Sequence, residues 1–230
     1  MRKISMVVLL VIVTNSIFAQ GLMKKDSTYK KMDYFHFEAA WLGWVNKPDS
    51  VKLKALSHTF SFYFTYPMQL GKSKINFIPG IGLNIDNAYT NSIAKEDSAK
   101  TQIVLHPITS GVSYKISKET YTYLMIPLMF NYNAGADSKS WKASLGLRFN
   151  YMIQDHTKYK GNDEVTGESE KTKNINILKP YSDRYRLDGA FTLGYDWFYV
   201  MATYSFTPYF ASGKGPQMMP LTIGIGAVGF

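Results

Sequence analysis

The chain has 230 residues, a formal net charge of +9, an aromatic content of 15% and no cysteine. The absence of thiols excludes a disulfide framework, a thiolate metal site and a lipidated N-terminal cysteine, and the aromatic content argues against intrinsic disorder. A basic excess suits nucleic acid or anionic lipid. The N-terminal segment described next predicts export, and for an exported chain we expect lipid and no nucleic acid.

The N-terminal segment 1–19 has the layout of a cleaved signal peptide. Arg2 and Lys3 form a positive start, and residues 4–13 form an apolar run. Ala19 supplies the small residue before the expected cut. The apolar run is shorter than the roughly 20 residues that a membrane helix needs. The sequence therefore predicts an exported chain whose mature part is either soluble or crosses a membrane as strands.

After a lead-in over residues 20–33, expected in the periplasm, the chain alternates between large apolar and small or polar residues. This period of two is the pattern of β-strands, and about 10 residues per segment suit a membrane strand. In the clearest segment, Phe60 and Phe62 share one face and Ser61 lies on the other. The predicted strands are 34–45, 57–70, 75–85, 121–133, 141–153, 185–195, 198–207 and 221–230. They predict an all-β fold, an eight-stranded antiparallel up-and-down transmembrane β-barrel of the outer-membrane type, over residues 34–230.

The connections between these segments alternate in length. Short turns follow the even-numbered segments, at 71–74, 134–140 and 196–197. Longer connections follow the odd-numbered ones, at 46–56, 86–120, 155–184 and 208–220. Outer-membrane barrels have short periplasmic turns and longer extracellular loops. The alternation therefore predicts that both termini lie in the periplasm. The two longest loops, being nearly balanced in charge, are interpreted as hydrated excursions without a polyanion groove.

Two classes of side chain gather at the expected periplasmic end. The basic rim consists of Lys72, Lys74, Lys139 and Lys142. The aromatic girdle consists of Tyr34, Tyr66, Tyr132, Trp141, Tyr195 and Trp197. Lysine would face phospholipid headgroups there, and Tyr and Trp are enriched at membrane interfaces. The alternative is that both residue types are simply common at strand ends.

Charged residues on the inward face are the candidate functional residues. The alternation points Glu38, Arg148 and Asp188 into an interior that is only wide enough for side chains. An unpaired buried charge is strongly unfavourable, so we predict an ionic network of Arg148 with Glu38 and Asp188. Its expected extensions are Arg186, His36, Asn150 and tyrosine hydroxyls. A plugged polar lumen is the leading interpretation, and a path for protons or small solutes is the alternative.

Motifs for catalysis and cofactor binding are absent. The sequence has no nucleotide-binding fingerprint and no nucleophile elbow, and its four histidines lack metal-ligand spacing. We therefore expect no cofactor, no metal and no enzymatic activity. Ser57 and His58 could form part of a lipid-modifying site at the outer rim, but no third partner is evident.

The stretch Tyr123–Met129, with the sequence YLMIPLM, resembles the Tyr-Leu-x-Ile-Pro-Leu strand of the PorT-like outer-membrane β-barrel family, common in Bacteroidota. The end of the export signal, Leu187-Asp188-Gly189 and the final Phe230 extend the resemblance. It implies an outer-membrane barrel and accounts for Pro127 within a strand. Some members belong to the type IX secretion and gliding apparatus, and many have no known activity. Members often carry an acidic residue where Met125 stands.

The final strand departs from the expected pattern. Insertion machinery reads a terminal aromatic residue in phase with the apolar face, and Phe230 is the candidate for this signal. Ile223 and Ile225 are out of phase with Phe230, so we predict a bulge near Ala227 and Val228. Outer-membrane lipid and the barrel-insertion machinery are the expected partners.

The leading hypothesis is a narrow, plugged barrel without enzymatic activity. Its long loops would serve envelope structure, adhesion or docking to a secretion complex of the type IX kind, with secretion or envelope proteins as partners. The alternatives are a small pore for ions or solutes, a lipid-modifying outer-membrane enzyme, and an exported soluble barrel like a lipocalin.

Overall fold

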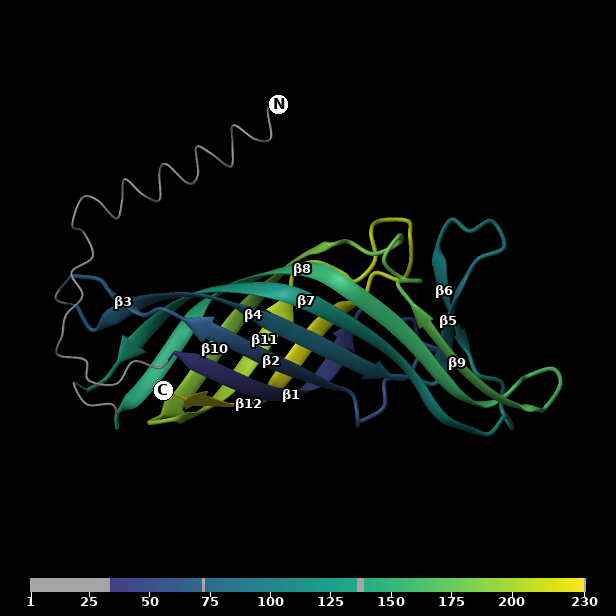
Figure 1. The fold of residues 1–230 in the computed structure, drawn as a ribbon, viewed down its shortest axis with the longest axis horizontal. Helices are drawn as coiled ribbons and strands as arrows, with labels where there is room; N and C mark the ends of the chain where they lie inside the picture. Colours follow the sequence, from purple (N-terminus) through teal and green to yellow (C-terminus); the bar gives the residue numbers. More distant parts are fainter. Residues whose placement is uncertain (1–33, 72, 136–138, 230) are drawn as a thin grey trace, which may run out of the picture.

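A computed structural model describes residues 34–71, 73–135 and 139–229, which form a closed antiparallel barrel (Figure 1). Each barrel strand pairs with the next, and β1 pairs with β12 to close the ring. The eight barrel strands in this part of the chain are β1 (Phe35–Val45), β2 (His58–Thr65), β4 (Ile75–Tyr89), β7 (Tyr114–Asn133), β8 (Trp141–Asn162), β10 (Tyr185–Tyr195), β11 (Phe198–Ser205) and β12 (Met219–Gly229). The predicted fold class and the alternation of short and long connections are confirmed.

Four further strands lie at the ends of the barrel: β3 (Met68–Gln69), β5 (Ser92–Glu96), β6 (Ile103–Pro107) and β9 (Ser169–Ile175). We call the end with the connections 71–74, 134–140 and 196–197 the turn end, and the opposite end the loop end. The chain between residues 34 and 229 starts and finishes at the turn end (Figure 1). No helix in the described residues is long and apolar enough to cross a membrane.

The barrel wall is apolar outside and polar inside. On β2, Phe60, Phe62 and Phe64 are exposed, whereas Ser61 and Tyr63 between them are buried. The outer apolar band consists of Phe35, Phe37, Trp41, Phe60, Phe62, Phe64, Ile81, Leu83, Leu124, Ile126, Phe130, Leu145, Leu147, Phe149, Tyr151, Ile153, Phe191, Leu193, Phe198, Val200, Tyr204, Ile223 and Ile225. A continuous apolar surface of this kind would be unfavourable in water, so it marks a face that contacts lipid.

Two barrel strands continue well past the outer apolar band. β7 begins at Tyr114 and β8 ends at Asn162, and β9 adds to the edge of β8. Together they form a three-stranded sheet beyond the loop end, which we call the extension (Figure 1). The predicted strands 75–85, 121–133 and 141–153 are therefore too short, and much of residues 86–120 and 155–184, assigned to loops, is β-structure.

A register shift explains why the sequence pattern stops short of the true strand end. Tyr123 of β7 pairs with Met152 of β8, but the preceding Thr122 pairs with Gln154, so Ile153 is an extra residue. A one-residue bulge reverses which side chains face inward along the rest of a strand. On β8, the residues that point outward are therefore odd-numbered up to Ile153 and even-numbered after it. The two-residue pattern read from the sequence breaks at this point, although the strand continues.

A tight turn joins β8 to β9. The Oδ1 atom of Asp163 accepts hydrogen bonds from the backbone amides of Thr166 at 2.7 Å and Val165 at 2.9 Å. These amides, Thr166 first, hold the pKa of the Asp163 carboxyl below its ordinary value. Gly167 has a φ of 72°, a left-handed conformation that suits glycine. The turn is thus built by its own residues and fixes the register of the extension.

The proline in β7 leaves a gap in the pairing of β7 with β4. Between β4 and β7, pairing stops at Pro79 with Leu128 and resumes at Gly82 with Met125. Pro127 lies in this gap and has no N–H to donate, although it stays in register with Arg148 on β8. A Cβ atom on Gly80 would meet the backbone carbonyl oxygen of Phe64 and would lie 2.9 Å from Cγ of Pro127, so the glycine makes room for both.

The final strand contains no bulge among its described residues, because β12 pairs in unbroken register with β1 and with β11. The predicted bulge near Ala227 and Val228 is therefore wrong. Ile223 and Ile225 remain on the outer face. The predicted signal peptide, the lead-in, Lys72 and Phe230 lie outside the described residues.

An apolar cluster closes the loop end. It joins side chains of the barrel strands to side chains of the β5–β6 hairpin and of the connections after β1, β9 and β11. Its members, which we call the apolar cap, are Leu42, Trp44, Val51, Ala88, Ala94, Ile103, Leu105, Tyr121, Tyr123, Met152, Leu178, Tyr181, Tyr209, Phe210 and Met218. The hairpin and these connections are thus packed over the barrel mouth.

Candidate functional site

The first interior site is an ion pair across the lumen. Arg148 of β8 donates two hydrogen bonds to Glu38 of β1, from Nη1 to Oε2 at 2.7 Å and from Nη2 to Oε1 at 2.8 Å. The hydroxyls of Tyr63 and Tyr199 also donate to Oε1 of Glu38, at 2.7 and 3.0 Å. Around the ring, β2, β4 and β7 separate β1 from β8 on one side, and β12, β11 and β10 on the other. Glu38 and Arg148 therefore come from opposite walls.

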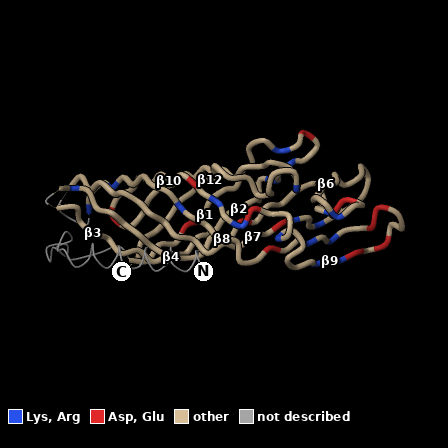
Figure 2. The backbone as a smooth tube through the Cα atoms, turned by 90° about the horizontal axis from the view of Figure 1, so that it is seen from above, with Lys and Arg blue, Asp and Glu red and all other residues tan. Residues whose placement is uncertain are grey.

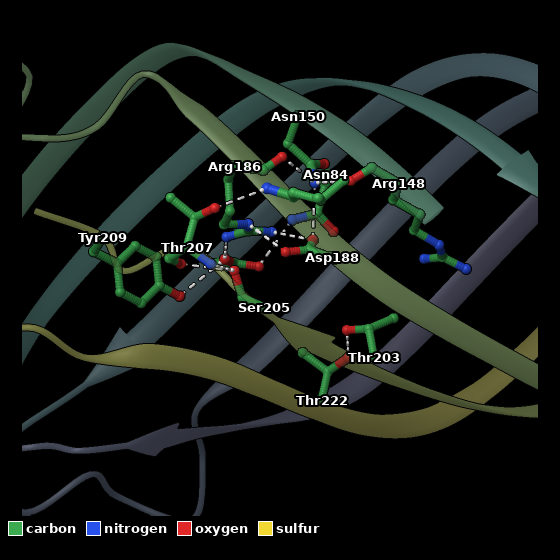
Figure 3. A network of polar contacts seen from close by, with 12 residues as sticks. Asn84, Arg148, Asn150, Arg186, Asp188, Thr203, Ser205, Thr207, Tyr209 and Thr222 are labelled. Carbon is green, nitrogen blue, oxygen red and sulfur yellow. Dashed lines mark hydrogen bonds and ion pairs between the residues drawn. The ribbon is translucent and has the colours of Figure 1, made fainter. Parts of the chain in front are cut away.

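The second interior site is centred on Arg186 of β10 (Figure 3). Its Nη1 atom donates to Oδ2 of Asp86 on β4 at 2.6 Å, and its Nε atom lies 3.1 Å from Oδ1 of Asp188. The hydroxyl of Tyr209 donates to the same Asp86 oxygen at 2.9 Å. The guanidinium carbon lies 4.2 Å from the ring centroid of Tyr123, a cation–π distance. One arginine thus joins two walls and a loop residue.

Neutral polar side chains donate further hydrogen bonds to the carboxylates of the Arg186 site (Figure 3). Asn150 donates to Oδ2 of Asp188 at 2.8 Å. Thr59 and Asn84 donate to Oδ1 of Asp86 at 2.8 and 3.0 Å. Buried charge is tolerated only when hydrogen bonds replace water in this way.

His36 lies at the turn-end side of the Glu38 site. Its ring stacks on Tyr63 with centroids 4.5 Å apart. Its Nδ1 atom is 3.3 Å from the hydroxyl of Tyr199, and its Nε2 atom is 3.1 Å from Oγ1 of Thr65. His36 therefore positions the two tyrosines that hold Glu38.

The charges of the two sites almost cancel. Glu38, Asp86 and Asp188 contribute three negative charges, and Arg148 and Arg186 contribute two positive ones. All five side chains are at most 5% exposed. In such an environment, loss of one partner leaves an uncompensated buried charge, which costs about 3–5 kcal/mol. The arrangement is suited to filling and bracing the lumen.

The partners differ from the predicted ones at two points. Asp188 is in register with Arg148 on the neighbouring strand, but its carboxylate is paired with Arg186. Asp86 was assigned to a loop, whereas it lies on β4 and is fully buried. Gly82 and Asn84 point inward, and Asp86 is the next inward position on the same strand. Extending the predicted strand by two residues would therefore have identified Asp86 as an interior carboxylate.

The aromatic residues predicted for a girdle all lie exposed at the turn end. Trp141 and Tyr195 are in register and in edge contact, with centroids 5.8 Å apart. The exposed fractions are 38% for Tyr34, 49% for Tyr66, Tyr132 and Tyr195, 58% for Trp141 and 57% for Trp197.

The described lysines of the predicted rim lie at the same end. Lys74 and Lys142 donate to the carbonyls of Ala134 and Asp196, at 3.0 and 3.4 Å, and Lys139 is exposed. These two carbonyls belong to the short turns, so the amines of Lys74 and Lys142 sit at the turn-end rim.

Ser57 and His58 do not form a nucleophile–base pair. Ser57 is buried, and its hydroxyl donates to the carbonyl of Tyr89 at 3.2 Å and accepts from the amide of the same residue at 2.9 Å. Nδ1 of His58 lies 2.8 Å from the carbonyl oxygen of Leu56. Both side chains brace the backbone at the loop end.

A match to a protein-family model agrees with this architecture. A family model described as "Outer membrane protein beta-barrel domain" matches residues 27–211. Comparison with curated proteins finds no match. Among solved structures, the chain is similar to Ail, the attachment invasion locus protein of Yersinia pestis, solved in complex with the heparin analogue sucrose octasulfate. That comparison has 11% identity and a TM-score of 0.32, and it covers 86% of this chain and 98% of Ail.

Proposed function

Because the chain belongs to the outer-membrane protein β-barrel domain family, we propose that it is a plugged barrel without enzymatic activity. Its loop end lies outside the cell and presents a folded platform for envelope structure, adhesion or docking to a secretion complex. Its turn end and both termini lie in the periplasm.

One observation carries this proposal: a buried ion pair joins opposite walls of the lumen. Glu38 and Arg148 meet across the ring with two hydrogen bonds, and the Arg186 site adds a second bridge. Past them, the apolar cap covers the mouth. A conducting pore needs a continuous water-filled path with charged groups facing water, whereas these charges are desolvated and paired.

Conductance in planar lipid bilayers tests the plug. The purified full chain should insert without steady channel openings. The double variant Glu38→Ala, Arg148→Ala removes both halves of the bridge without leaving an unpaired charge, and it should show small, frequent openings. The matched control Lys47→Ala, Lys139→Ala changes two described lysines outside the lumen and should stay closed. Steady conductance of the unmodified protein would overturn the plugged barrel in favour of the small pore.

The geometry at Ser57 and His58 supports the absence of an enzymatic role. A catalytic serine requires a base within hydrogen-bond reach and an accessible hydroxyl. Here the hydroxyl is buried and bonded to backbone, and the imidazole bonds to a different carbonyl. Lipid analysis of membranes containing the protein or its His58→Ala variant should give the same lipid profile.

The proposed orientation gives the turn-end residues their roles. The exposed aromatic residues form the girdle at the periplasmic interface, and Lys74, Lys139 and Lys142 face phospholipid headgroups. The barrel-insertion machinery is the expected partner during assembly, with Phe230 as its signal.

The platform consists of the extension and the β5–β6 hairpin, and it supports the docking role. The resemblance to the PorT-like family makes a secretion or envelope protein the proposed partner. A photo-crosslinker at Val165, which is 92% exposed at the tip of the extension, should capture that partner in intact cells. The same crosslinker at Lys139, at the opposite end, is the control. Equal capture at both sites would contradict docking at the loop end.

A further inference from the structure

Five lysines share the outward face of the extension. Lys118 of β7, Lys158 of β8 and Lys173 of β9 are directly in register with one another. One step further toward the tip, Lys160 of β8 is in register with Lys171 of β9. Residues in register on neighbouring strands point to the same side of a sheet. We call these five residues the lysine face, and the charged tips of the strands are visible in Figure 2.

The carboxylates of these three strands lie on the opposite face. Glu119 and Asp155 are buried and point inward, and Glu170 alternates with Lys171 on β9. None of the five lysines forms an ion pair with a carboxylate in the part of the chain that the structure describes. The amine of Lys118 instead donates to Oδ1 of Asn87 at 2.9 Å and lies 5.4 Å from the ring centroid of Tyr89. The positive charge of the lysine face is therefore uncompensated within the described chain.

Like charges directly opposite each other destabilise a sheet. Lysines on an edge strand are an ordinary protection against unwanted strand pairing, and this accounts for Lys171 and Lys173 on β9. It does not account for Lys118 and Lys158, because β7 and β8 are paired on both sides at these positions. An external anion bound between the lysine amines of neighbouring strands would replace this repulsion by attraction.

The lysine face continues the side of the barrel that contacts lipid. On β7, Lys118 has the same parity as Leu124 and Ile126 of the outer apolar band, with no bulge between them on that strand. The six residues from Leu124 to Lys118 span about 20 Å of strand at about 3.3 Å each. With the tilt of about 40° usual in membrane barrels, this is about 15 Å of height. The amines thus lie beyond the hydrocarbon, at the depth of large headgroups.

We propose that the lysine face binds the phosphate groups of glycolipid headgroups in the outer leaflet of the membrane that the barrel spans. Clusters of four to eight basic residues next to a membrane are the general signature of anionic headgroup binding. The lipid would hold the extension at a set angle to the membrane and steady the platform. This inference rests on the proposed orientation but not on the plug or on any docking partner.

Native mass spectrometry of the full chain, released from nanodiscs, tests the proposal. The nanodiscs contain either bis-phosphorylated lipid A or the same glycolipid without its phosphates. The unmodified protein should retain the phosphorylated form preferentially. The triple variant Lys118→Gln, Lys158→Gln, Lys173→Gln should bind it on the order of 100-fold more weakly, because each lysine contributes about a tenfold step in affinity or less.

A matched control removes three other loop-end lysines, Lys47, Lys52 and Lys214, by substitution with Gln. This control has the same change in net charge and should retain the lipid as the unmodified protein does. Heat-modifiable gel mobility verifies that both variants are folded barrels. Equal retention of the two glycolipids, or equal loss in both variants, would overturn the lysine face as a lipid site.

A third arm distinguishes lipid from a soluble anion. Detergent-solubilised protein is titrated with dextran sulfate, a soluble polyanion without acyl chains. If the triple variant loses dextran sulfate binding but keeps lipid A, the face serves a soluble polyanion and the lipid proposal is wrong. Independent labelling of the loop end on intact cells separates this failure from a failure of the proposed orientation.

Discussion

Removal of Arg148 tests the charged interior most directly. In Arg148→Met, Glu38 keeps the hydroxyl donors of Tyr63 and Tyr199 but loses two charge-assisted hydrogen bonds of 2.7 and 2.8 Å. Hydrogen bonds to charged groups contribute about 1.5–3 kcal/mol each, and breaking a buried pair costs about 3–5 kcal/mol. We therefore expect the free energy of unfolding to fall by about 4 kcal/mol.

The double variant Glu38→Gln, Arg148→Met separates the ion pair from the packing of its side chains. The amide introduced at position 38 would still accept from the tyrosine hydroxyls but would carry no charge, so the double variant should recover about 2–3 kcal/mol relative to Arg148→Met. The assay is reversible urea unfolding in lipid vesicles, followed by tryptophan fluorescence. Lys139→Met, at the exposed turn end, is the control and should change stability by less than about 0.5 kcal/mol. A coupling energy near zero between positions 38 and 148 would refute the bridge across the lumen.

Three further predictions concern other parts of the molecule. Gly80→Ala should destabilise the barrel by about 1–3 kcal/mol in the same unfolding assay, because its Cβ would meet the backbone carbonyl of Phe64 and the ring of Pro127; unchanged stability would contradict this packing. Phe210→Ala should lower stability by about 3–5 kcal/mol and the temperature of the heat-modifiable gel shift, because Phe210 is fully buried in the apolar cap. The chain has no cysteine, so Val165→Cys should react with an impermeant maleimide on intact cells and Lys139→Cys should not; the reverse pattern would invert the proposed orientation.

Much of the barrel was predictable because the side-chain period of a strand is local information. Phe60, Ser61 and Phe62 reveal two faces without any knowledge of a neighbouring strand. The same local alternation pointed Glu38 and Arg148 inward. The strand segments and the turn positions followed from this period together with the lengths of the connections.

The pairings that the prediction missed depend on the relation between strands. Arg186 pairs with Asp86 and Asp188 because the register of β4, β8 and β10 brings those side chains to one level. No local pattern states which of two inward arginines reaches which carboxylate. The apolar cap is similarly non-local, since Leu178 and Phe210 belong to connections whose packing depends on the closed barrel.

The lysine face likewise depends in part on the local sequence and in part on strand register. Lysines spaced by two on residues 158–160 and 171–173 are visible in the sequence, but they lay in segments interpreted as hydrated loops. One extra residue at Ile153 reverses the faces of β8, and only the resulting register sets Lys118 beside Lys158 and Lys173. The sequence by itself thus determined which side of each strand is apolar, because that depends on a two-residue period. The tertiary structure decided which charges meet, because strand register and barrel closure join residues far apart in the chain.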